Sequence, residues 1–337
     1  MTQTYQRIVL ASRPQGGAVS PDNFRLERVP VPGIGPGQVL VRNHFLSLDP
    51  YMRGRMDDAK SYSAPQPIGE TMIGGTAGVV EASQNPKFAP GDAVVGYLGW
   101  QEYGVSDGTG LNKVETKHVP LSAYLGPVGM PGVTAWYGLH EICKPKAGET
   151  VLVSAASGAV GSVVGQLAKM SGCRAVGIAG GPEKCAYVRD ELGFDACIDH
   201  REHKDIRSMS IALKEAAPNG IDCLFENVGG VGLDAALARM NAFGRIALCG
   251  LIAGYEGGDI AIHNTRALLV NRLSLRGFIV SEHLEIWPQA LGELARGVAT
   301  GKIKYRESIA DGLAAAPAAF IGMLRGKNFG KQLVKLT

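Results

Sequence analysis

The sequence lacks three features that would mark a special class of protein: a C-x-x-C pair, a long apolar run and a block of like charges. Its six cysteines are widely separated and mostly flanked by apolar residues, which is typical of reduced thiols in a core. His200 and His203 are close in sequence, but their polar surroundings are typical of a solvated loop. We therefore predict neither a disulfide-rich scaffold nor a metal site.

The charge and hydropathy patterns exclude two kinds of partner. The 34 basic and 31 acidic residues are scattered along the chain, so no arm for nucleic acid is predicted. No apolar window approaches the roughly 18 residues that a membrane span needs. The N-terminal MTQTYQRIVL has no charged segment followed by an apolar one, so we expect a cytoplasmic protein that contacts no membrane.

The chain of 337 residues is long for one domain, and its pattern changes near residue 126. From 126 to 301, short β-branched runs alternate with stretches of helical spacing, which predicts a doubly wound parallel α/β sheet of the Rossmann type. The expected strands are Val151–Val153, Arg174–Ile178, Ala196–Asp199, Ile221–Glu226, Gly244–Cys249 and Leu275–Val280.

The flanking segments differ from this pattern. Residues 1–125 are rich in Gly and Pro and contain short alternating runs bounded by turn signals, which predicts an antiparallel β domain. In the tail we expect a strand at 302–305, a helix at 315–325 and a strand at 331–336. A terminal strand must pair somewhere. We therefore predict that 302–337 completes the β domain, with the active site in the cleft beside the 126–301 domain.

The stretch SAASGAVGS, residues 154–162, lies between an expected strand and an expected helix. It matches the dinucleotide fingerprint with Ala156 in place of the first glycine, followed by Gly158 and Gly161. Small residues at a helix N-terminus let a pyrophosphate approach the backbone N–H groups. A glycine-rich turn can also serve packing alone, but the strand–turn–helix context favours a cofactor.

The second expected strand ends in Ile178-Ala179-Gly180-Gly181, without the acid that usually holds a ribose hydroxyl. This leaves room for a 2′-phosphate, and Lys184 has the charge to bind it. Two alternatives stay open: Glu183 as a ribose ligand, and Lys184 as a solvated helix residue. NADPH is favoured over NADH.

Several motifs together resemble a known family: SLDPYMR (47–53), GMPGVTA (129–135), AASGAVGS (155–162), ENVGG (226–230) and GKNFGK (326–331). They resemble the zinc-independent medium-chain dehydrogenase/reductases, in the group of leukotriene and prostaglandin, alkenal double-bond and curcumin reductases. The resemblance implies a GroES-like β domain plus a Rossmann domain. It also implies a homodimer, with Leu275–Val280 as a candidate edge, and NADPH-dependent reduction of the carbon–carbon double bond in α,β-unsaturated aldehydes or ketones.

The same resemblance assigns the cofactor site. Gly158, Ala159, Val160 and Gly161 would cradle the pyrophosphate, and Lys184 would meet the 2′-phosphate. At a position where the family often has a tyrosine against the same phosphate, this chain has His200. The remaining cofactor contacts implied are Met130, Thr134, Asn227, the segment Cys249 to Tyr255, Phe278, Ile279, Val280 and Asn328.

Conjugate reduction develops negative charge on the carbonyl oxygen, so the site needs a hydrogen-bond donor there. The resemblance places Tyr255 facing the substrate, and Tyr51 of the SLDPYMR motif is the second candidate. The alternatives are packing of Tyr255 across the cleft and a turn-forming role for the motif of Tyr51. The proton for the α carbon would come from solvent or from a cofactor hydroxyl.

Zinc-dependent relatives would carry an early cysteine and a Gly-His-Glu cluster. Here the corresponding segments are Asp49-Pro50-Tyr51 and Gly75-Thr76-Ala77, and residues 1–125 contain no cysteine. Alcohol oxidation through a zinc alkoxide is therefore disfavoured. Two alternatives to an enone or enal reductase remain, namely an NADPH quinone reductase of the same superfamily and an NADPH-binding protein of low turnover.

Overall fold

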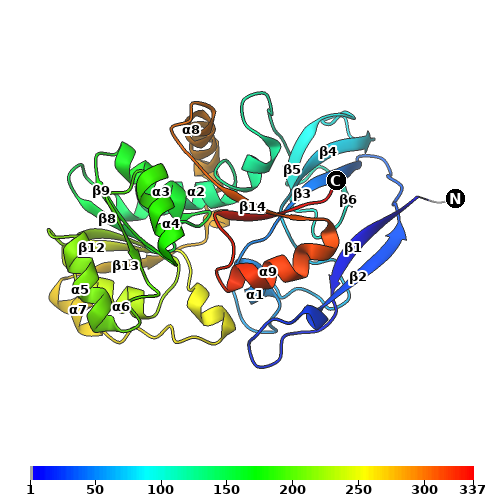
Figure 1. Ribbon diagram of the computed structural model, residues 1–337. Helices are drawn as coiled ribbons and strands as arrows, with labels where there is room; N and C mark the ends of the chain where they lie inside the picture. The colour runs from blue at the N-terminus through cyan, green and yellow to red at the C-terminus, as the bar shows by residue number, and fades with distance from the viewer. Residues whose placement is uncertain (1–2) are drawn as a thin grey trace. The chain divides into compact units, whose positions relative to one another are not determined.

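The computed structural model describes residues 3–337, which divide into two compact units. The first unit comprises residues up to Leu125 together with Glu307–Thr337, and the second comprises Gly126–Arg306 (Figure 1). Within residues 3–337, no helix combines the length and the apolar character needed to cross a membrane.

The second unit is a doubly wound α/β fold around a parallel sheet of six strands, in the order β10-β9-β8-β11-β12-β13. This is the Rossmann order, in which the chain reverses direction between the first and the fourth strand of the sequence. The strands are β8 (Thr150–Val153), β9 (Arg174–Ala179), β10 (Ala196–Asp199), β11 (Ile221–Glu226), β12 (Met240–Leu248) and β13 (Ser274–Gly277).

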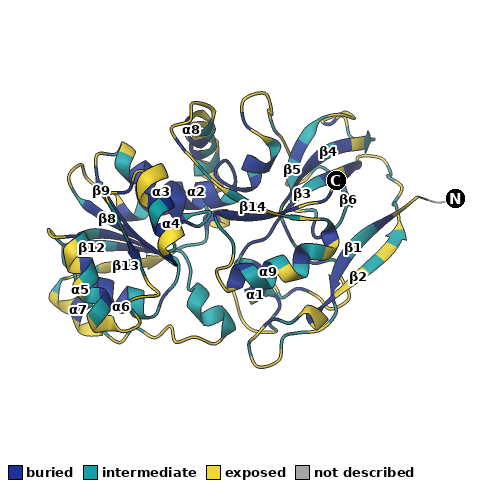
Figure 2. Ribbon diagram, viewed as in Figure 1, coloured by how far each residue is buried: buried dark blue, intermediate teal, exposed yellow. Residues whose placement is uncertain are grey.

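Helices cover both faces of this sheet. In Figure 1, α3 and α4 lie on one side of it, and α5, α6 and α7 lie on the other. The helices are α2 (Met130–Tyr137), α3 (Gly161–Met170), α4 (Pro182–Ala186), α5 (Ile206–Ala216), α6 (Val231–Leu237), α7 (Thr265–Val270) and α8 (Trp287–Ala299). The central strand β8 is buried along its whole length, as its dark blue colour in Figure 2 indicates. An apolar strand covered on both faces is what a parallel sheet requires.

The first unit is mostly antiparallel. A two-stranded ribbon, β1 (Thr4–Leu10) with β2 (Phe24–Pro30), accompanies a larger sheet ordered β14-β15-β3-β4-β5-β7, with β6 paired to β3. The other elements are β3 (Val39–Ser47), β4 (Thr76–Ser83), β5 (Ala93–Gly96), β6 (Tyr103–Ser106), β7 (Asn112–Lys113), β14 (Glu307–Asp311), β15 (Lys331–Lys335), α1 (Tyr51–Arg55) and α9 (Ala316–Leu324). Leu333 of β15 pairs with Ser47 of β3, so the last strand returns to the β domain as predicted.

The strand predicted at 302–305 was wrong. Residues 302–306 form no strand and cluster with the second unit, because the Gln166 side chain bonds both the N–H and the C=O of Lys304, each at 2.8 Å. Ile303 is also buried, and its side chain occupies the space that a Cβ on Gly297 would fill. The boundary between the units therefore lies at Arg306/Glu307, five residues beyond the predicted position.

Two strands in the second unit, β12 and β13, differ from the predicted bounds by more than one residue. β12 begins at Met240 instead of Gly244, because Ile221 of β11 already pairs with Met240. β13 ends at Gly277, and Val280 begins a short 3₁₀ turn, Val280–Glu282. The backbone of Phe278-Ile279-Val280 is therefore a loop at the carboxyl edge of the sheet.

Candidate active site

The loop between β8 and α3 has the geometry of an anion site. A Cβ on Gly161 would overlap the carbonyl oxygen of Ala155, so only glycine lets the loop close against the helix. The N-cap residue of α3, Val160, offers no side-chain hydrogen bond to the first turn. The N–H groups of Ser162 and Val163 donate to the carbonyl oxygens of Gly158 and Val160 at 3.1 and 3.0 Å, so the attraction for an anion here comes from the helix dipole and from small residues that leave the backbone approachable. The predicted pyrophosphate cradle, Gly158 to Gly161, thus fits its ligand.

A second polar corner forms where β9 and β10 end. Gly181 has φ +95°, a conformation that favours glycine, and its N–H donates to Asp199 Oδ1 at 2.8 Å. The same oxygen accepts the N–H of Arg201 at 3.0 Å. Although burial opposes it, these two hydrogen bonds lower the pKa of Asp199. The ionised carboxylate fastens the turn after β10 onto the turn before α4.

Three basic side chains, those of Lys184, His200 and Arg201, surround this corner. A Cβ on Gly180 would lie 2.8 Å from His200 Nε2, and one on Gly181 would lie 2.9 Å from Arg201 Nη1. Burial, and then the charge of Arg201, lower the pKa of Lys184. Burial also lowers the pKa of His200, opposed by Asp199 and assisted by Arg201 and Lys184. Basic groups that disfavour one another's positive charge in this way form a fitting site for a phosphate dianion.

Arg201 was missed by the sequence analysis. It lies in the polar stretch 199–204, which the composition assigned to a solvated loop, and only its contact with Gly181 identifies it. The feature of the sequence that could have identified Arg201 as a cofactor ligand is its position directly after His200. Glu183, the alternative ribose ligand, is exposed in the first turn of α4.

The loops after β8 and β11 are tied together around a buried carboxylate. Glu226 is 1% exposed, and its Oε1 accepts Ser154 Oγ at 2.8 Å and the N–H groups of Val228 and Gly229 at 2.6 and 2.8 Å. Burial raises the pKa of Glu226 in spite of these bonds. Asn227 is anchored as well, because its Nδ2 donates to the carbonyl oxygen of Ser154 at 2.8 Å.

Tyr255 lies on the 3₁₀ turn Ile252–Glu256, next to this anchored loop. Ile252 donates its N–H to the carbonyl oxygen of Asn227 at 3.2 Å, and Ala253 donates to that of Val228 at 3.0 Å. Cys249 donates its N–H to the carbonyl oxygen of Glu226 at 2.9 Å. The structure therefore brings the predicted residues Asn227, Cys249 and Tyr255 onto two bonded loops at the carboxyl edge of the sheet.

The other predicted residues of this unit lie on α2 and after β13. Thr134 is buried, and its hydroxyl already donates to the carbonyl oxygen of Met130 at 2.7 Å. The ring of Phe278 packs on Tyr137, with ring centres 5.4 Å apart. The carbonyl oxygen of Val280 accepts the indole N–H of Trp287 at 3.2 Å.

In the first unit, Tyr51 opens α1 with a hydroxyl that is buried and has no hydrogen-bond partner within residues 3–337. Burial, and then the negative charge of Asp49, raise the pKa of Tyr51 well above its usual value. The phenol is therefore neutral and holds a proton that it can donate. Asn328, in the same unit, donates its Nδ2 to the carbonyl oxygen of Gly330 at 2.7 Å.

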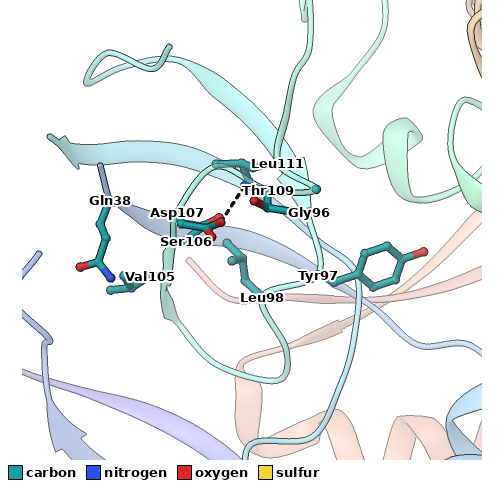
Figure 3. A pocket seen from close by; sticks show the side chains of 10 residues that line it. Gln38, Gly96, Tyr97, Leu98, Val105, Ser106, Asp107, Thr109 and Leu111 are labelled. Carbon is teal, nitrogen blue, oxygen red and sulfur yellow. Dashed lines mark hydrogen bonds between the residues drawn. The ribbon is translucent and has the colours of Figure 1, made fainter. Parts of the chain in front are cut away.

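A separate cavity of about 490 Å³ lies in the first unit beside β5 and β6 (Figure 3). None of the predicted site residues lines it. Its carboxylate, Asp107, accepts the N–H of Thr109 at 2.8 Å, and Tyr97 points away from this pair in Figure 3. Within the described residues, no three His, Cys, Asp or Glu side chains are grouped to hold a metal.

Known proteins match this chain along nearly its full length. Residues 6–114 match the family described as the N-terminal domain of oxidoreductase, and residues 159–296 match the one described as zinc-binding dehydrogenase. The NADPH-dependent curcumin reductase of Escherichia coli is 47% identical, covering 99% of this chain and 97% of that protein. The NADP⁺-dependent 2-alkenal reductase of Nicotiana tabacum is 46% identical, covering 90% and 88%.

A solved structure agrees with these relatives. The crystal structure of CurA in complex with NADPH from Vibrio vulnificus superposes with a TM-score of 0.91 at 46% identity, covering 98% of this chain and 99% of that one. The antiparallel unit, the Rossmann unit and the motifs within them agree with these matches. The chain therefore belongs to the zinc-independent medium-chain dehydrogenase/reductases, in the group of the curcumin, alkenal and prostaglandin reductases.

Proposed function

We propose that the protein is an NADPH-dependent reductase of the carbon–carbon double bond in α,β-unsaturated aldehydes and ketones. The observation that carries the proposal is the buried, neutral hydroxyl of Tyr51, which has no partner within the described residues. A buried donor without a partner is costly unless a ligand supplies an acceptor. The names of the relatives, curcumin reductase and 2-alkenal reductase, support an enone or enal carbonyl as that acceptor.

The cofactor residues of this proposal are those of the second unit. The loop of Gly158 to Gly161 at the start of α3 would hold the pyrophosphate of NADPH, and Lys184, His200 and Arg201 would hold its 2′-phosphate. The loops of Asn227 and of Cys249 to Tyr255 would contact the ribose and nicotinamide, with Met130, Thr134, the backbone of 278–280, and Asn328 of the first unit. NADPH, when bound, supplies the hydride that reduces the β carbon.

The tyrosines act on the substrate. Charge moves to the carbonyl oxygen as the β carbon is reduced, and a donor aimed at that oxygen lowers the barrier. Tyr51 donates its hydroxyl proton to a hydrogen bond with this oxygen and stays protonated, because its pKa is far above neutral pH. Tyr255 is the second proposed donor, on the turn that is fastened to Asn227 and Val228. The α carbon takes its proton from solvent or from a cofactor hydroxyl.

The test is NADPH oxidation by the purified protein with a simple enone, its saturated ketone or a quinone, each repeated with NADH. We expect turnover of the enone but not of the ketone, with NADPH preferred. Turnover of the quinone alone would replace the proposal with a quinone reductase. Tight NADPH binding without turnover of any substrate would favour a binding protein.

We also propose a homodimer in the cytoplasm that continues the second unit's sheet through β13. This strand is the last of the sheet, and three of its four residues are exposed. An exposed edge strand is a template for pairing with another chain. Light scattering should give twice the mass of the chain, and hydrogen exchange of the β13 amides should slow as the protein concentration rises. A monomer at all concentrations would rule the dimer out.

A further inference from the structure

Two buried polar side chains, those of Ser154 and Glu226, meet at the carboxyl edge of the second unit's sheet. Val153 at the end of β8 pairs with Phe225 of the parallel strand β11. The next two residues, Ser154 and Glu226, are therefore neighbours across the sheet, and Ser154 Oγ donates to Glu226 Oε1 at 2.8 Å. The strand order reverses between β8 and β11, and doubly wound folds bind their ligands at such a reversal.

The hydrogen bonds of the Ser154 hydroxyl have fixed directions. Its oxygen accepts the backbone N–H of Asn227 at 2.7 Å, and a hydroxyl has only one proton of its own to donate. Glu226 Oε1 is the nearest acceptor for that proton. The same oxygen accepts the N–H groups of Val228 and Gly229 at 2.6 and 2.8 Å. One serine and one carboxylate thus hold the main chain of the three residues that follow β11.

The backbone of Glu226 extends this arrangement to the next strand. Its carbonyl oxygen accepts the N–H groups of Cys249 and Gly250, at 2.9 and 3.2 Å, in the loop after β12. Glu226 therefore joins three loops at the carboxyl edge, those after β8, β11 and β12. Because buried hydrogen-bond networks are costly to break, these loops are held in one arrangement.

These contacts decide which atom of the Asn227 amide is available. Its Nδ2 donates to the carbonyl oxygen of Ser154 at 2.8 Å, which requires the amide nitrogen, and not the amide oxygen, at that position. Within residues 3–337 no group donates to Asn227 Oδ1, and the half-buried residue leaves that oxygen open to a ligand. An amide oxygen only accepts hydrogen bonds, so the ligand group that meets it must carry an O–H or N–H.

We propose that Ser154 and Glu226 are positioning residues for the nicotinamide half of NADPH, and that Asn227 Oδ1 accepts a hydrogen bond from a hydroxyl of the nicotinamide ribose. The inference rests on the proposed binding of NADPH and not on the proposed substrate. Ser154 begins the stretch 154–162 that would hold the pyrophosphate, and the ribose is the part of the nicotinamide half that is bonded directly to that pyrophosphate. A ribose held in this way fixes the place from which the hydride leaves.

The test compares NADPH with adenosine 2′,5′-bisphosphate, a fragment that has the 2′-phosphate but no nicotinamide ribose. The dissociation constants of both ligands are measured for the full-length wild type, Ser154→Ala and Glu226→Leu. We expect both variants to bind NADPH about fivefold or more weakly, through loss of about one hydrogen bond, and to bind the fragment as the wild type does. Ser154→Thr and Glu226→Gln, which keep the hydroxyl and the acceptor oxygen, should retain most of the NADPH affinity.

Asp222→Ala is the matched control. Asp222 lies near the opposite end of β11, and its Oδ2 accepts the N–H of Thr150, at the start of β8, at 2.8 Å. Its loss weakens the contact between the same two strands without reaching the carboxyl edge, so both dissociation constants should stay unchanged. A second ligand, reduced 3-acetylpyridine adenine dinucleotide phosphate, lacks the carboxamide N–H. Ser154→Ala should weaken its binding by the same factor as that of NADPH.

Three results would overturn the proposal. Equal losses of affinity for NADPH and for the fragment would mean that Ser154 and Glu226 serve only the fold. Unchanged NADPH affinity in both variants would refute the positioning role. An unaffected 3-acetylpyridine analogue would mean that the donor is the carboxamide and not the ribose. If the wild type binds NADPH but reduces no enone, the proposed reaction fails, and these binding measurements still test the positioning residues.

Discussion

Lys331 Nζ lies 2.7 Å from Asp49 Oδ1, and both side chains are buried. The ammonium also donates to the carbonyl oxygen of Leu48 at 2.8 Å, and Ser47 Oγ donates to Asp49 Oδ2. The pair therefore ties β15 to the turn that precedes α1, on which Tyr51 lies. The GKNFGK and SLDPYMR motifs, at opposite ends of the sequence, meet through this one ion pair.

We predict that Lys331→Met lowers the free energy of unfolding by about 3–5 kcal/mol, because it leaves the Asp49 carboxylate buried without its cation. The double variant Asp49→Asn with Lys331→Met should recover a large part of this loss, since it buries no charge. Urea unfolding of the wild type, both single variants and the double variant measures the coupling. If the losses of unfolding free energy in the two single variants simply add up in the double variant, the two side chains do not interact directly.

We predict that Tyr51→Phe lowers kcat by about 100- to 1,000-fold, the usual effect of losing one donor to a developing oxyanion. The KM for NADPH should change little, because the ring remains in place. Tyr5→Phe is the matched control: Tyr5 is also a buried phenol of the first unit with a raised pKa, but its hydroxyl bonds Gln101 Oε1 at 3.0 Å. Equal losses in both variants would mean that Tyr51 acts only in packing.

We predict that Arg201→Ala and Lys184→Ala each raise the KM for NADPH about tenfold or more and leave the KM for NADH unchanged. Arg201 lies against Gly181 and its charge acts on Lys184, and at this corner only the 2′-phosphate would meet the two cations. Arg207→Ala, which removes an exposed arginine on the nearby α5, is the control for net charge. An equal rise in the KM for NADH would exclude these residues as ligands of the 2′-phosphate.

The sequence was sufficient to predict which helices and strands the second unit contains, but it predicted the residues at which they begin and end less accurately. The six strands of the second unit could be predicted because buried parallel strands are continuous apolar runs, as in β8. The strand predicted at 302–305 failed because its alternation reflects burial of Ile303 and capture of the Lys304 backbone by Gln166, and not sheet pairing. Such long-range contacts leave no periodic signal.

Some residues of the candidate site could likewise be predicted from the sequence, and others could not. The glycines at 158 and 161 and the missing acid after β9 could be interpreted locally, because backbone approach and charge are properties of short segments. The Lys331–Asp49 pair joins residues 282 positions apart, and Arg201 becomes a cofactor candidate only through the fold that places it on Gly181. Buried polar partners of this kind require coordinates.

We predict that His200 makes NADPH binding dependent on pH. Burial keeps the pKa of the free imidazole below its usual 6.5, with Asp199 opposing and Arg201 and Lys184 assisting, so His200 is neutral at pH 7. A bound 2′-phosphate would raise that pKa, so binding takes up a proton, and the contribution of His200 is present at low pH and lost as the pH rises. The NADPH dissociation constant of His200→Asn should therefore exceed that of the wild type several-fold near pH 6 and by much less near pH 8. The phosphate's own titration, at a pKa of about 6, affects both proteins equally and cancels in the ratio. A ratio that does not change with pH, or the same change with NADH, would exclude His200 as a phosphate ligand.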